Sequence, residues 1–347
     1  MLKVKQLGVA AAIALFASAA MASNFRAADQ VYIPAAGHIV GSTATFVSDV
    51  FISNLSDDSV DVSVIYATGS SASTAVQTPF PKVLTLAPRE RRELLDFMST
   101  TLHLTSALGQ VIFNGCLKDA DCTPNATTGL NANYRNISVE SRIYSFATGA
   151  NQATAPTNGQ LFSGIPWYNF VSESASGAGL DKVFITGIRN TPSFKTNVGF
   201  VNASQFSTTT LTAKLYSGAA PSTVIATASF TLPPLGFLQS TVGAGNLFGA
   251  AVPQSTTSTN LFITVEQGGT QKVVGGANDA DLNGCPTGCP AFFSYGSQLD
   301  NQTTDATTLE AQYSLPLTNN AITCIYSPDV AACKAGTTIH RAAKHQF

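Results

Sequence analysis

The stretch Phe46-Val-Ser-Asp-Val-Phe-Ile-Ser-Asn54-Leu-Ser56 decides the fold, because a version of it returns as Phe194-Lys-Thr-Asn-Val-Gly-Phe-Val-Asn202-Ala-Ser204. In both places a Thr-Leu-x-Pro sequence follows after a nearly equal interval, at Thr85 to Pro88 and at Thr231 to Pro234. Shared markers at a shared spacing indicate a tandem duplication of one folding unit. A duplicated unit favours a modular binding or structural protein, and it does not name a ligand.

Alternating apolar and polar residues predict β-strands in both halves of the chain. Val60 and Val62, for example, alternate with Asp61 and Ser63. A period of two residues is typical of half-buried antiparallel strands. Each half contains about seven such segments separated by turns rich in Gly, Pro, Asn and Ser, which is the pattern of a β-sandwich. We therefore predict an all-β protein with two tandem antiparallel β-sandwich domains. The only candidate helix is a turn or two near residues 89–98, and the alternative for this stretch is a strand.

A change in composition between the two halves places the domain boundary. The segment Ser172-Glu-Ser-Ala-Ser-Gly-Ala-Gly179 is small and polar, as flexible linkers are. We therefore predict a first β-sandwich domain at residues 29–166, a linker at 167–181 and a second β-sandwich domain at 182–315. The repeat has ended by that point, which leaves a Cys-containing C-terminal tail at 316–347.

The N-terminal residues have the pattern of a secretory signal peptide. Lys3 and Lys5 precede an apolar run from Leu7 to Ala20, and small residues up to Ala22 supply a cleavage site. We expect residues 1–22 to be removed and the protein to be secreted, either to the periplasm or to the extracellular space. No later stretch is long and apolar enough to predict a transmembrane segment.

The charge of the chain argues against a nucleic-acid partner. The sequence has 18 basic and 20 acidic side chains and a net charge of −2. Binding to phosphates needs a clustered cationic face, which this balance does not favour. Only 11% of the residues are charged, and the abundant hydroxyl and amide side chains suit the outward positions of extracellular strands. We expect the partner to be a cell-surface polymer, an extracellular polymer or a protein.

Six cysteines fall into three close pairs. In an exported protein, an even number of cysteines in local pairs predicts disulfides. Spacing alone leaves the connectivity open, because six cysteines can be joined in many ways. We favour local pairing, since the first two pairs lie in equivalent loops of the two halves. The three pairs are Cys116 with Cys122, Cys285 with Cys289, and Cys324 with Cys333.

The two loops that carry the first two cysteine pairs are the candidates for a working surface. They run from about residue 114 to 135 and from about 267 to 290, which is longer than most structureless connections in compact domains. Each loop carries an Asp-x-Asp pattern beside its cysteines. We predict that Asp119 and Asp121 lie on the surface of the first loop and contribute to binding.

The second loop is similar to the first half of a calcium-binding loop. Asp279, Asp281 and Asn283 place oxygen ligands at alternate positions, and Gly284 follows for a sharp turn. The closing Glu of such a loop would fall at Pro290, whose side chain has no oxygen. The alternative is a solvated Asp/Asn turn. We favour the solvated turn and therefore predict no cofactor, with a calcium ion at this loop as the second interpretation.

Five short motifs are spread over most of the chain. They are Val31-Tyr-Ile-Pro34 with His38, Asp49-Val-Phe-Ile-Ser-Asn54, Gly159-Gln160, Thr196-Asn-Val-Gly-Phe-Val-Asn202 and Leu299-Asp-Asn-Gln-Thr303. Together they resemble a family of exported, mostly uncharacterised bacterial proteins with tandem immunoglobulin-like β-sandwich modules. The resemblance spans about residues 29 to 315, and it implies an immunoglobulin-like fold and an extracellular setting. It implies far less about function. Neither half has the Cys, Trp, Cys arrangement of antibody domains.

The sequence contains no specific catalytic motif. It lacks a Gly-x-Ser-x-Gly elbow and a His-Glu-x-x-His metal motif. His38 has no partner that the sequence identifies, so we expect it to have a structural role. We predict an exported non-enzymatic protein that acts at or outside the cell surface in adhesion, ligand binding or structural support. The alternatives are a subunit of an extracellular fibre or surface layer, and a hydrolase or its carbohydrate-binding accessory.

Overall fold

A computed structural model describes most of the duplicated region. The described residues are 27–68, 77–123, 131–166, 171–172, 182–203, 208–243, 247–249, 252, 254–267, 291–303 and 305–313. The predicted signal peptide at 1–22 and the predicted tail at 316–347 lie outside them. Among the described residues, no helix is long and apolar enough to cross a bilayer.

The first half consists almost entirely of strands, as the alternating pattern predicts. Its one described helix, α2 (Phe97–Thr100), is a single turn. The described strands of this half are β1 (Gln30–Val40), β2 (Ala44–Asn54), β3 (Val60–Thr68), β4 (Gln77–Leu86), β5 (Arg91–Leu94), β6 (Ala107–Leu117), β7 (Ile137–Ala147), β8 (Asn158–Ser163) and β9 (Ile165–Pro166).

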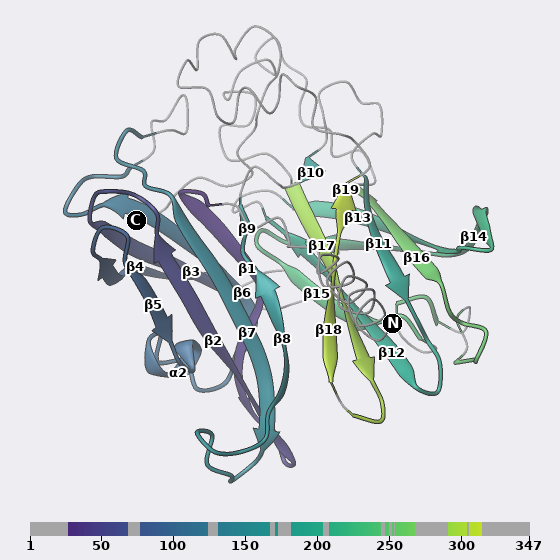
Figure 1. Ribbon diagram of the computed structural model, residues 1–347. Helices are drawn as coiled ribbons and strands as arrows, with labels where there is room; N and C mark the ends of the chain where they lie inside the picture. Colours follow the sequence, from purple (N-terminus) through teal and green to yellow (C-terminus); the bar gives the residue numbers. More distant parts are fainter. Residues whose placement is uncertain are drawn as a thin grey trace, which may run out of the picture.

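The described part of the second half contains strands only. They are β10 (Val171–Ser172), β11 (Lys182–Ile188), β12 (Phe194–Asn202), β13 (Thr209–Ser217), β14 (Ala220–Leu232), β15 (Phe237–Thr241), β16 (Leu261–Gln267), β17 (Ala291–Asp300), β18 (Ala306–Glu310) and β19 (Gln312–Tyr313). All pairings among these strands are antiparallel. The prediction of an all-β fold with antiparallel sheets is therefore confirmed (Figure 1).

The strand pairing of the first half repeats in the second. In the first half β2 lies between β5 and β7, β3 lies between β4 and β6, and β1 pairs with β6 and β9. In the second half β12 lies between β15 and β17, β13 lies between β14 and β16, and β11 pairs with β16 and β19. This correspondence is what the repeated sequence stretch predicts.

Each half fills a core of its own, in the first half within one nine-stranded sheet that continues from β1 to β2, and in the second half between two five-stranded sheets. In the first half, Val50 and Ile52 of β2 pack with apolar residues of β3 and β6. Their counterparts in the second half, Val198 and Phe200 of β12, pack with apolar residues of β13 and β16. Inward residues at every second position bury the same face of each strand, which is how a period of two builds a sandwich core.

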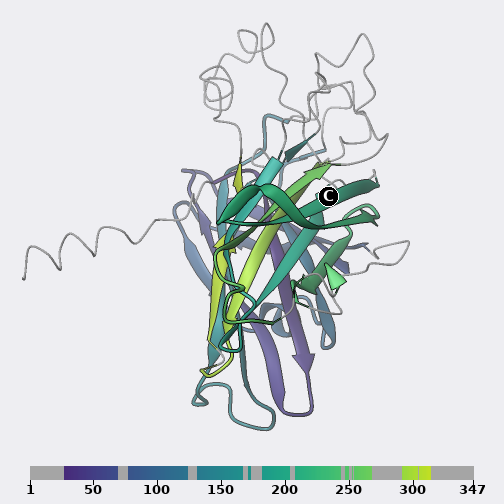
Figure 2. The same ribbon diagram turned by 90° about the vertical axis from the view of Figure 1, so that its right-hand side faces the viewer.

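A third apolar cluster joins the two halves. It forms where the outer face of the β1-β3-β6 sheet meets the outer face of the β12-β15-β17 sheet, and Figure 2 shows the second half packed in front of the first. The buried members of this junction cluster are Tyr32, Ala35, Ile65, Ala67, Ile112, Phe162, Val201, Ala203, Leu235, Phe237, Phe293 and Tyr295. An apolar layer of this kind holds the two halves in one fixed arrangement.

Buried polar side chains complete the junction. Gln110 Nε2 donates to the carbonyl oxygens of Asn202 at 3.2 Å and Leu235 at 2.7 Å. The Tyr32 hydroxyl donates to the Ala203 carbonyl at 3.3 Å. The hydroxyl of Tyr295 lies 2.8 Å from Gln239 Oε1, and burial strongly raises its pKa. These bonds satisfy groups that would otherwise cost free energy when buried.

Three predicted boundaries differ from the structure. Val171 and Ser172 lie in the predicted linker but form β10, because they complete the edge beside β17. The first long loop begins after Leu117 rather than at Asn114, since β6 stays paired with β3 as far as Leu117. The one helical turn, α2, begins at Phe97 rather than near Arg89, because residues 91–94 pair with β2 and form the strand that was the alternative for this stretch.

Candidate functional site

The first cysteine pair forms a disulfide at the end of β6. Cys116 and Cys122 are joined with a Cα–Cα distance of 6.0 Å, and both side chains are buried. Cys116 belongs to β6, whereas Cys122 lies in the connection to β7. The predicted pairing of these two residues is confirmed. The bond closes residues 116–122 into a small ring at the surface.

Hydrogen bonds give the loop a defined shape. The backbone N–H of Asp119 donates to Asp61 Oδ2 at 3.0 Å, and Asp119 has a positive φ of 58°, which Asp tolerates better than most residues. The N–H of Thr123 donates to Asp121 Oδ1 at 2.8 Å, which is a local turn typical of Asp. The side-chain amides of Asn131 and Asn133 both donate to the Asp121 carbonyl, at 3.1 and 2.8 Å. The outgoing and returning parts of the loop are thereby tied together.

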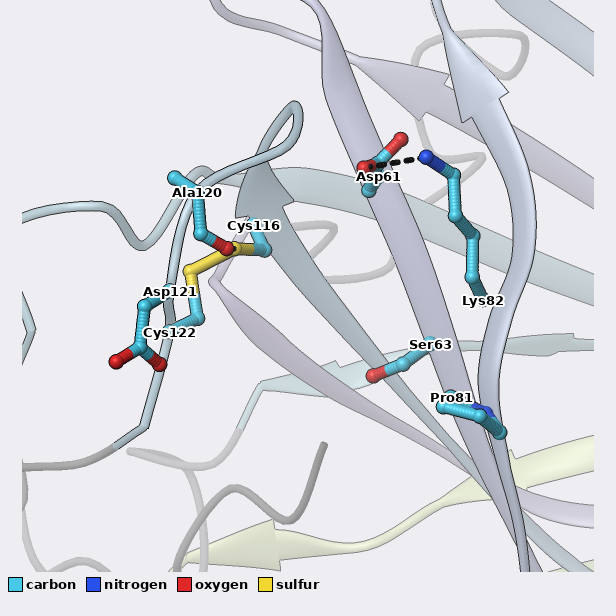
Figure 3. A pocket seen from close by; sticks show the side chains of 8 residues that line it. All are labelled: Asp61, Ser63, Pro81, Lys82, Cys116, Ala120, Asp121 and Cys122. Carbon is cyan, nitrogen blue, oxygen red and sulfur yellow. Dashed lines mark hydrogen bonds and ion pairs between the residues drawn. A yellow bond between two sulfur atoms is a disulfide. The ribbon is translucent and has the colours of Figure 1, made fainter.

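A shallow hollow lies between this loop and strands β3 and β4, as Figure 3 shows. Its volume is about 160 Å³. Pockets that enclose whole small molecules are larger, roughly 300–1,000 Å³. The hollow is therefore too small to enclose a whole small molecule. It is lined by Asp61, Ser63, Pro81, Lys82, Cys116, Ala120, Asp121 and Cys122.

An ion pair occupies one wall of the hollow. Lys82 Nζ lies 2.8 Å from Asp61 Oδ2, and Thr85 Oγ1 also donates to the Asp61 carboxylate. Burial raises the pKa of Asp61, but the hydrogen bonds from Lys82 and Thr85 outweigh it and lower the pKa overall. The same hydrogen bond with Asp61 raises the pKa of Lys82. This wall is therefore charged at neutral pH.

The two predicted binding residues lie apart. The Asp119 carboxylate is exposed and pairs with Lys118 at 3.1 Å and with Lys82 at 3.4 Å. The Asp121 carboxylate lies on the other side of the disulfide from Lys82 (Figure 3), and hydrogen bonds from Thr123 lower its pKa. Within the described chain, no group of three or more His, Cys, Asp or Glu side chains is arranged to hold a metal ion. Asp119 is therefore paired with two lysines, whereas the Asp121 carboxylate lies apart from them on the other side of the disulfide.

The remaining predicted site residues lie outside the described residues. They are the calcium candidates Asp279, Asp281 and Asn283, and the cysteines Cys285, Cys289, Cys324 and Cys333. Their pairing and their role in metal binding stay predictions.

The structure also brings together a buried polar network around His38 that the sequence did not reveal. His38 Nδ1 lies 2.9 Å from Asp96 Oδ1, and the Asp96 N–H donates to Asp49 Oδ1 at 2.9 Å. The Tyr144 hydroxyl donates to the same Asp49 oxygen at 3.2 Å, and Gln152 Nε2 donates to Tyr144 at 2.8 Å. Burial raises the pKa of the Asp49 carboxyl despite these bonds. The residues come from strands β1, β2 and β7 and from the connections that hold Asp96 and Gln152, which are distant in the sequence, so no linear spacing could have indicated the network.

The His38 network orients the segment before α2. Asp96 has a positive φ of 45°, and its two hydrogen-bonded partners hold it in that conformation. A His–Asp pair also occurs in hydrolytic triads, where the second ring nitrogen meets a nucleophile. Among the described residues, no hydroxyl or thiol hydrogen-bonds to His38 Nε2. The geometry fits the structural role expected for His38, and Asp96 is the partner that the sequence did not identify.

Comparisons with known proteins found little that is similar to this chain. No protein-family model matches it, and no curated protein matches it. A solved structure described as "Biofilm associated protein - BSP domain" is 10% identical to it, with a TM-score of 0.20. The alignment covers 85% of this chain, which spans 61% of the length of that one. A likeness of this degree supports no inference about fold or function.

Proposed function

We propose that the protein is exported and acts at or outside the cell surface by non-enzymatic binding, in adhesion, ligand recognition or structural support. The observation that carries the proposal is the Cys116–Cys122 loop. It is exposed and acidic, and it is fixed in shape by a disulfide and by hydrogen bonds to β3. A surface that is ordered before it meets its ligand loses less conformational entropy on binding.

The rest of the molecule supports this proposal. A disulfide at the surface is stable in an oxidising compartment, which agrees with the predicted signal peptide. The junction cluster fixes the two halves relative to one another, so surfaces on both can engage one extended ligand. The resemblance to exported proteins with tandem immunoglobulin-like modules is consistent with the same setting.

The hollow suggests how the loop would bind. It takes a single protruding group beside the Asp61–Lys82 pair, with Asp121 on the opposite side of the disulfide. Cationic or hydroxyl-rich groups on a polymer fit these neighbours, because carboxylates accept hydrogen bonds from both. A polysaccharide with amino groups, or a basic protein segment, is the class of ligand that we favour.

The test is a binding assay with purified protein against polysaccharides and cell-surface fractions. Asp119→Asn with Asp121→Asn should weaken binding, and loss of the disulfide in Cys116→Ala with Cys122→Ala should weaken it further. Asp57→Asn is the matched control, because Asp57 is an exposed acid outside this loop. Equal binding by all of these variants would remove this loop as the site. Absence of binding by the unaltered protein would contradict the proposed function itself.

A further inference from the structure

The sheet of β14, β13, β16, β11 and β19 carries a row of stacked aromatic rings on its outer face. Tyr216 of β13 and Phe262 of β16 are opposite one another in the strand register, and their ring centroids lie 4.9 Å apart with 7° between the ring planes. Phe184 of β11 continues the row, at 6.4 Å and 29° from Phe262. All three side chains are half-buried. The stacked rings form an apolar ridge across three neighbouring strands, which we call the aromatic ridge.

Polar side chains lie beside the aromatic ridge on the same face. Lys214 and Glu266 form an ion pair, so each supplies the opposite charge that the other needs. The hydroxyl groups of Thr212 and Ser229 lie 3.0 Å apart, and Thr227 is exposed on β14. The face thus combines one apolar row with rows of hydroxyl groups.

The same face of the first half is the one that docks against the second half. The strand registers match five positions of the two faces, and the pairs, second half first, are Phe184 and Tyr32, Thr264 and Ile112, Lys214 and Ile65, Phe262 and Gln110, and Tyr216 and Ala67. All five first-half residues are buried at the junction.

The junction therefore shows how this face looks when a protein surface covers it. Aliphatic side chains fill it, and the polar atoms of Tyr32 and Gln110 reach backbone carbonyl groups of the other half. In the second half the aliphatic positions carry Lys214, Tyr216 and Thr264 instead. Figure 1 shows this sheet on the side of the second half that faces away from the first. The face has thus lost the features that dock protein on protein in this molecule, and it has gained rings and hydroxyl groups.

We propose that the aromatic ridge and the hydroxyl groups beside it bind a polysaccharide through its sugar rings. A sugar ring combines the same two chemistries as this face, because its C–H groups are apolar and its rim carries hydroxyl groups. The C–H groups pack against the rings, which are already held in place by one another and lose little conformational entropy on binding. Hydroxyl groups of the same sugar reach Thr212, Ser229 and Thr227, whose own hydroxyls both donate and accept hydrogen bonds.

This binding face is separate from the surface on which the proposed function rests. The Cys116–Cys122 loop belongs to the first half, whereas the aromatic ridge belongs to the second. The loop offers charged groups, and the ridge offers apolar rings with hydroxyl groups. Because the junction cluster fixes the two halves, one long polymer that contacts both surfaces gains from the high effective concentration of the second contact.

The test is affinity electrophoresis of the purified protein in gels that contain dextran, xylan, galactomannan or a soluble β-glucan. We expect the unaltered protein to be retarded by at least one of these neutral polysaccharides, and high salt should not abolish the effect. Tyr216→Leu keeps an apolar side chain but removes the ring, so it should raise the dissociation constant by about tenfold. Tyr216→Phe keeps the ring and should bind as the unaltered protein does.

Two further variants keep the test independent of the stability of the ridge. Thr212→Val with Ser229→Ala removes hydroxyl groups without touching a ring, and it should also weaken binding. Phe46→Ala is the matched control, since Phe46 is 44% exposed and lies on β2 in the first half; it should leave binding unchanged. Chemical denaturation of each variant checks that it is folded under the conditions of the gel.

Several results would overturn the inference. They are equal retardation of the unaltered protein and of Tyr216→Leu, no retardation by any of the four polysaccharides, and retardation only by anionic polymers at low salt. Self-association that Tyr216→Leu abolishes in the absence of polysaccharide would identify a second copy as the occupant and would also overturn it. Asp119→Asn with Asp121→Asn separates the two surfaces: we expect these loop variants to keep the binding that Tyr216→Leu weakens, and the opposite result would assign the polysaccharide to the loop and overturn the role of the ridge.

Discussion

Asn54 and Asn202 occupy equivalent positions in the two halves and bind equivalent carbonyl groups. Asn54 Nδ2 donates to the Ala87 carbonyl at 2.8 Å, and Asn202 Nδ2 donates to the Pro233 carbonyl at 2.8 Å. Ala87 and Pro233 are the variable residues of the two Thr-Leu-x-Pro sequences. The two repeated markers of the sequence therefore contact one another, and each pair locks the end of β2 or β12 to the turn after β4 or β14.

Removing either amide should destabilise the protein. Asn54 is 1% exposed and Asn202 is 0% exposed, so truncation removes buried side-chain hydrogen bonds and the packing of the amide. We expect Asn54→Ala and Asn202→Ala each to lower the free energy of unfolding by about 1–3 kcal/mol, measured by chemical denaturation. Gln302→Ala, at an exposed amide side chain in a turn, should change it little. A negligible effect at both Asn positions would show that the contact does not explain the repeat.

The junction between the halves can be tested with one pair of equivalent residues. Ile65 on β3 is buried in the junction cluster, whereas Lys214, at the matching position on β13, lies on the outer face and pairs with Glu266. Ile65→Lys buries an unpaired charge, so we expect the halves to separate and calorimetry to show two unfolding transitions. Lys214→Ile should retain the single transition expected of the unaltered protein. One unchanged transition in Ile65→Lys would contradict the role of this cluster.

The disulfide should contribute to stability by closing a short loop. The chain-entropy estimate for a ring of this size is about 2 kcal/mol. Cys116→Ala with Cys122→Ala should therefore unfold at lower denaturant concentration under oxidising conditions. Adding a reductant should lower the stability of the unaltered protein by more than that of the variant. If reductant lowers the stability of the unaltered protein and of the variant equally, the stabilisation that reductant removes comes from other cysteines of the chain.

Asp49 should make stability depend on pH. Burial raises the pKa of Asp49 in the folded protein above its value in the unfolded chain. At pH values between the two, the folded protein binds the proton and the unfolded chain does not. The stability contributed by the protonated group is present at low pH and is lost as pH rises through the folded pKa. Asp49→Asn removes this loss, so the stability of the variant relative to the unaltered protein should increase with pH.

Tyr144→Phe tests the pKa shift of the Asp49 carboxyl in a second way. It removes a hydrogen bond that favours the charged form of Asp49. The loss of stability with rising pH should therefore become larger in this variant, measured by urea denaturation at several pH values. A relative stability of Asp49→Asn that falls with rising pH would contradict the sign of the shift.

Most of the fold could be predicted from the sequence, because it depends on local periodicity and on the repeat. The docking of the two halves was missed, although a signal was present. Ile65 is apolar at an outward position of β3, and Val111-Ile-Phe113 is an unbroken apolar run. Such runs mark strands that are buried on both faces. A prediction that assigns one face of every strand to solvent therefore overlooks strands that are buried on both faces.

The candidate site was predicted in part. The Cys116–Cys122 pair was predicted because the first two cysteine pairs lie in equivalent loops of the two halves, and the structure joins these two residues. The contribution of Asp61 and Lys82 could not be predicted, since it depends on how β3 and β4 pair, with a register shift between Val62 and Val64. The network of His38 with Asp96 likewise depends on a contact between β1 and the distant turn that precedes α2.

The position of β6 has a mechanical consequence. This strand carries Cys116 at one end and Gln110 and Ile112 of the junction in its middle. A ligand that pulls on the loop therefore applies tension along β6, which is bonded on both sides, to β1 and to β3. The force then runs along the strands, so many of the hydrogen bonds that join β6 to β1 and to β3 must break at once. An attachment built in this way holds under drag that would peel a hairpin open.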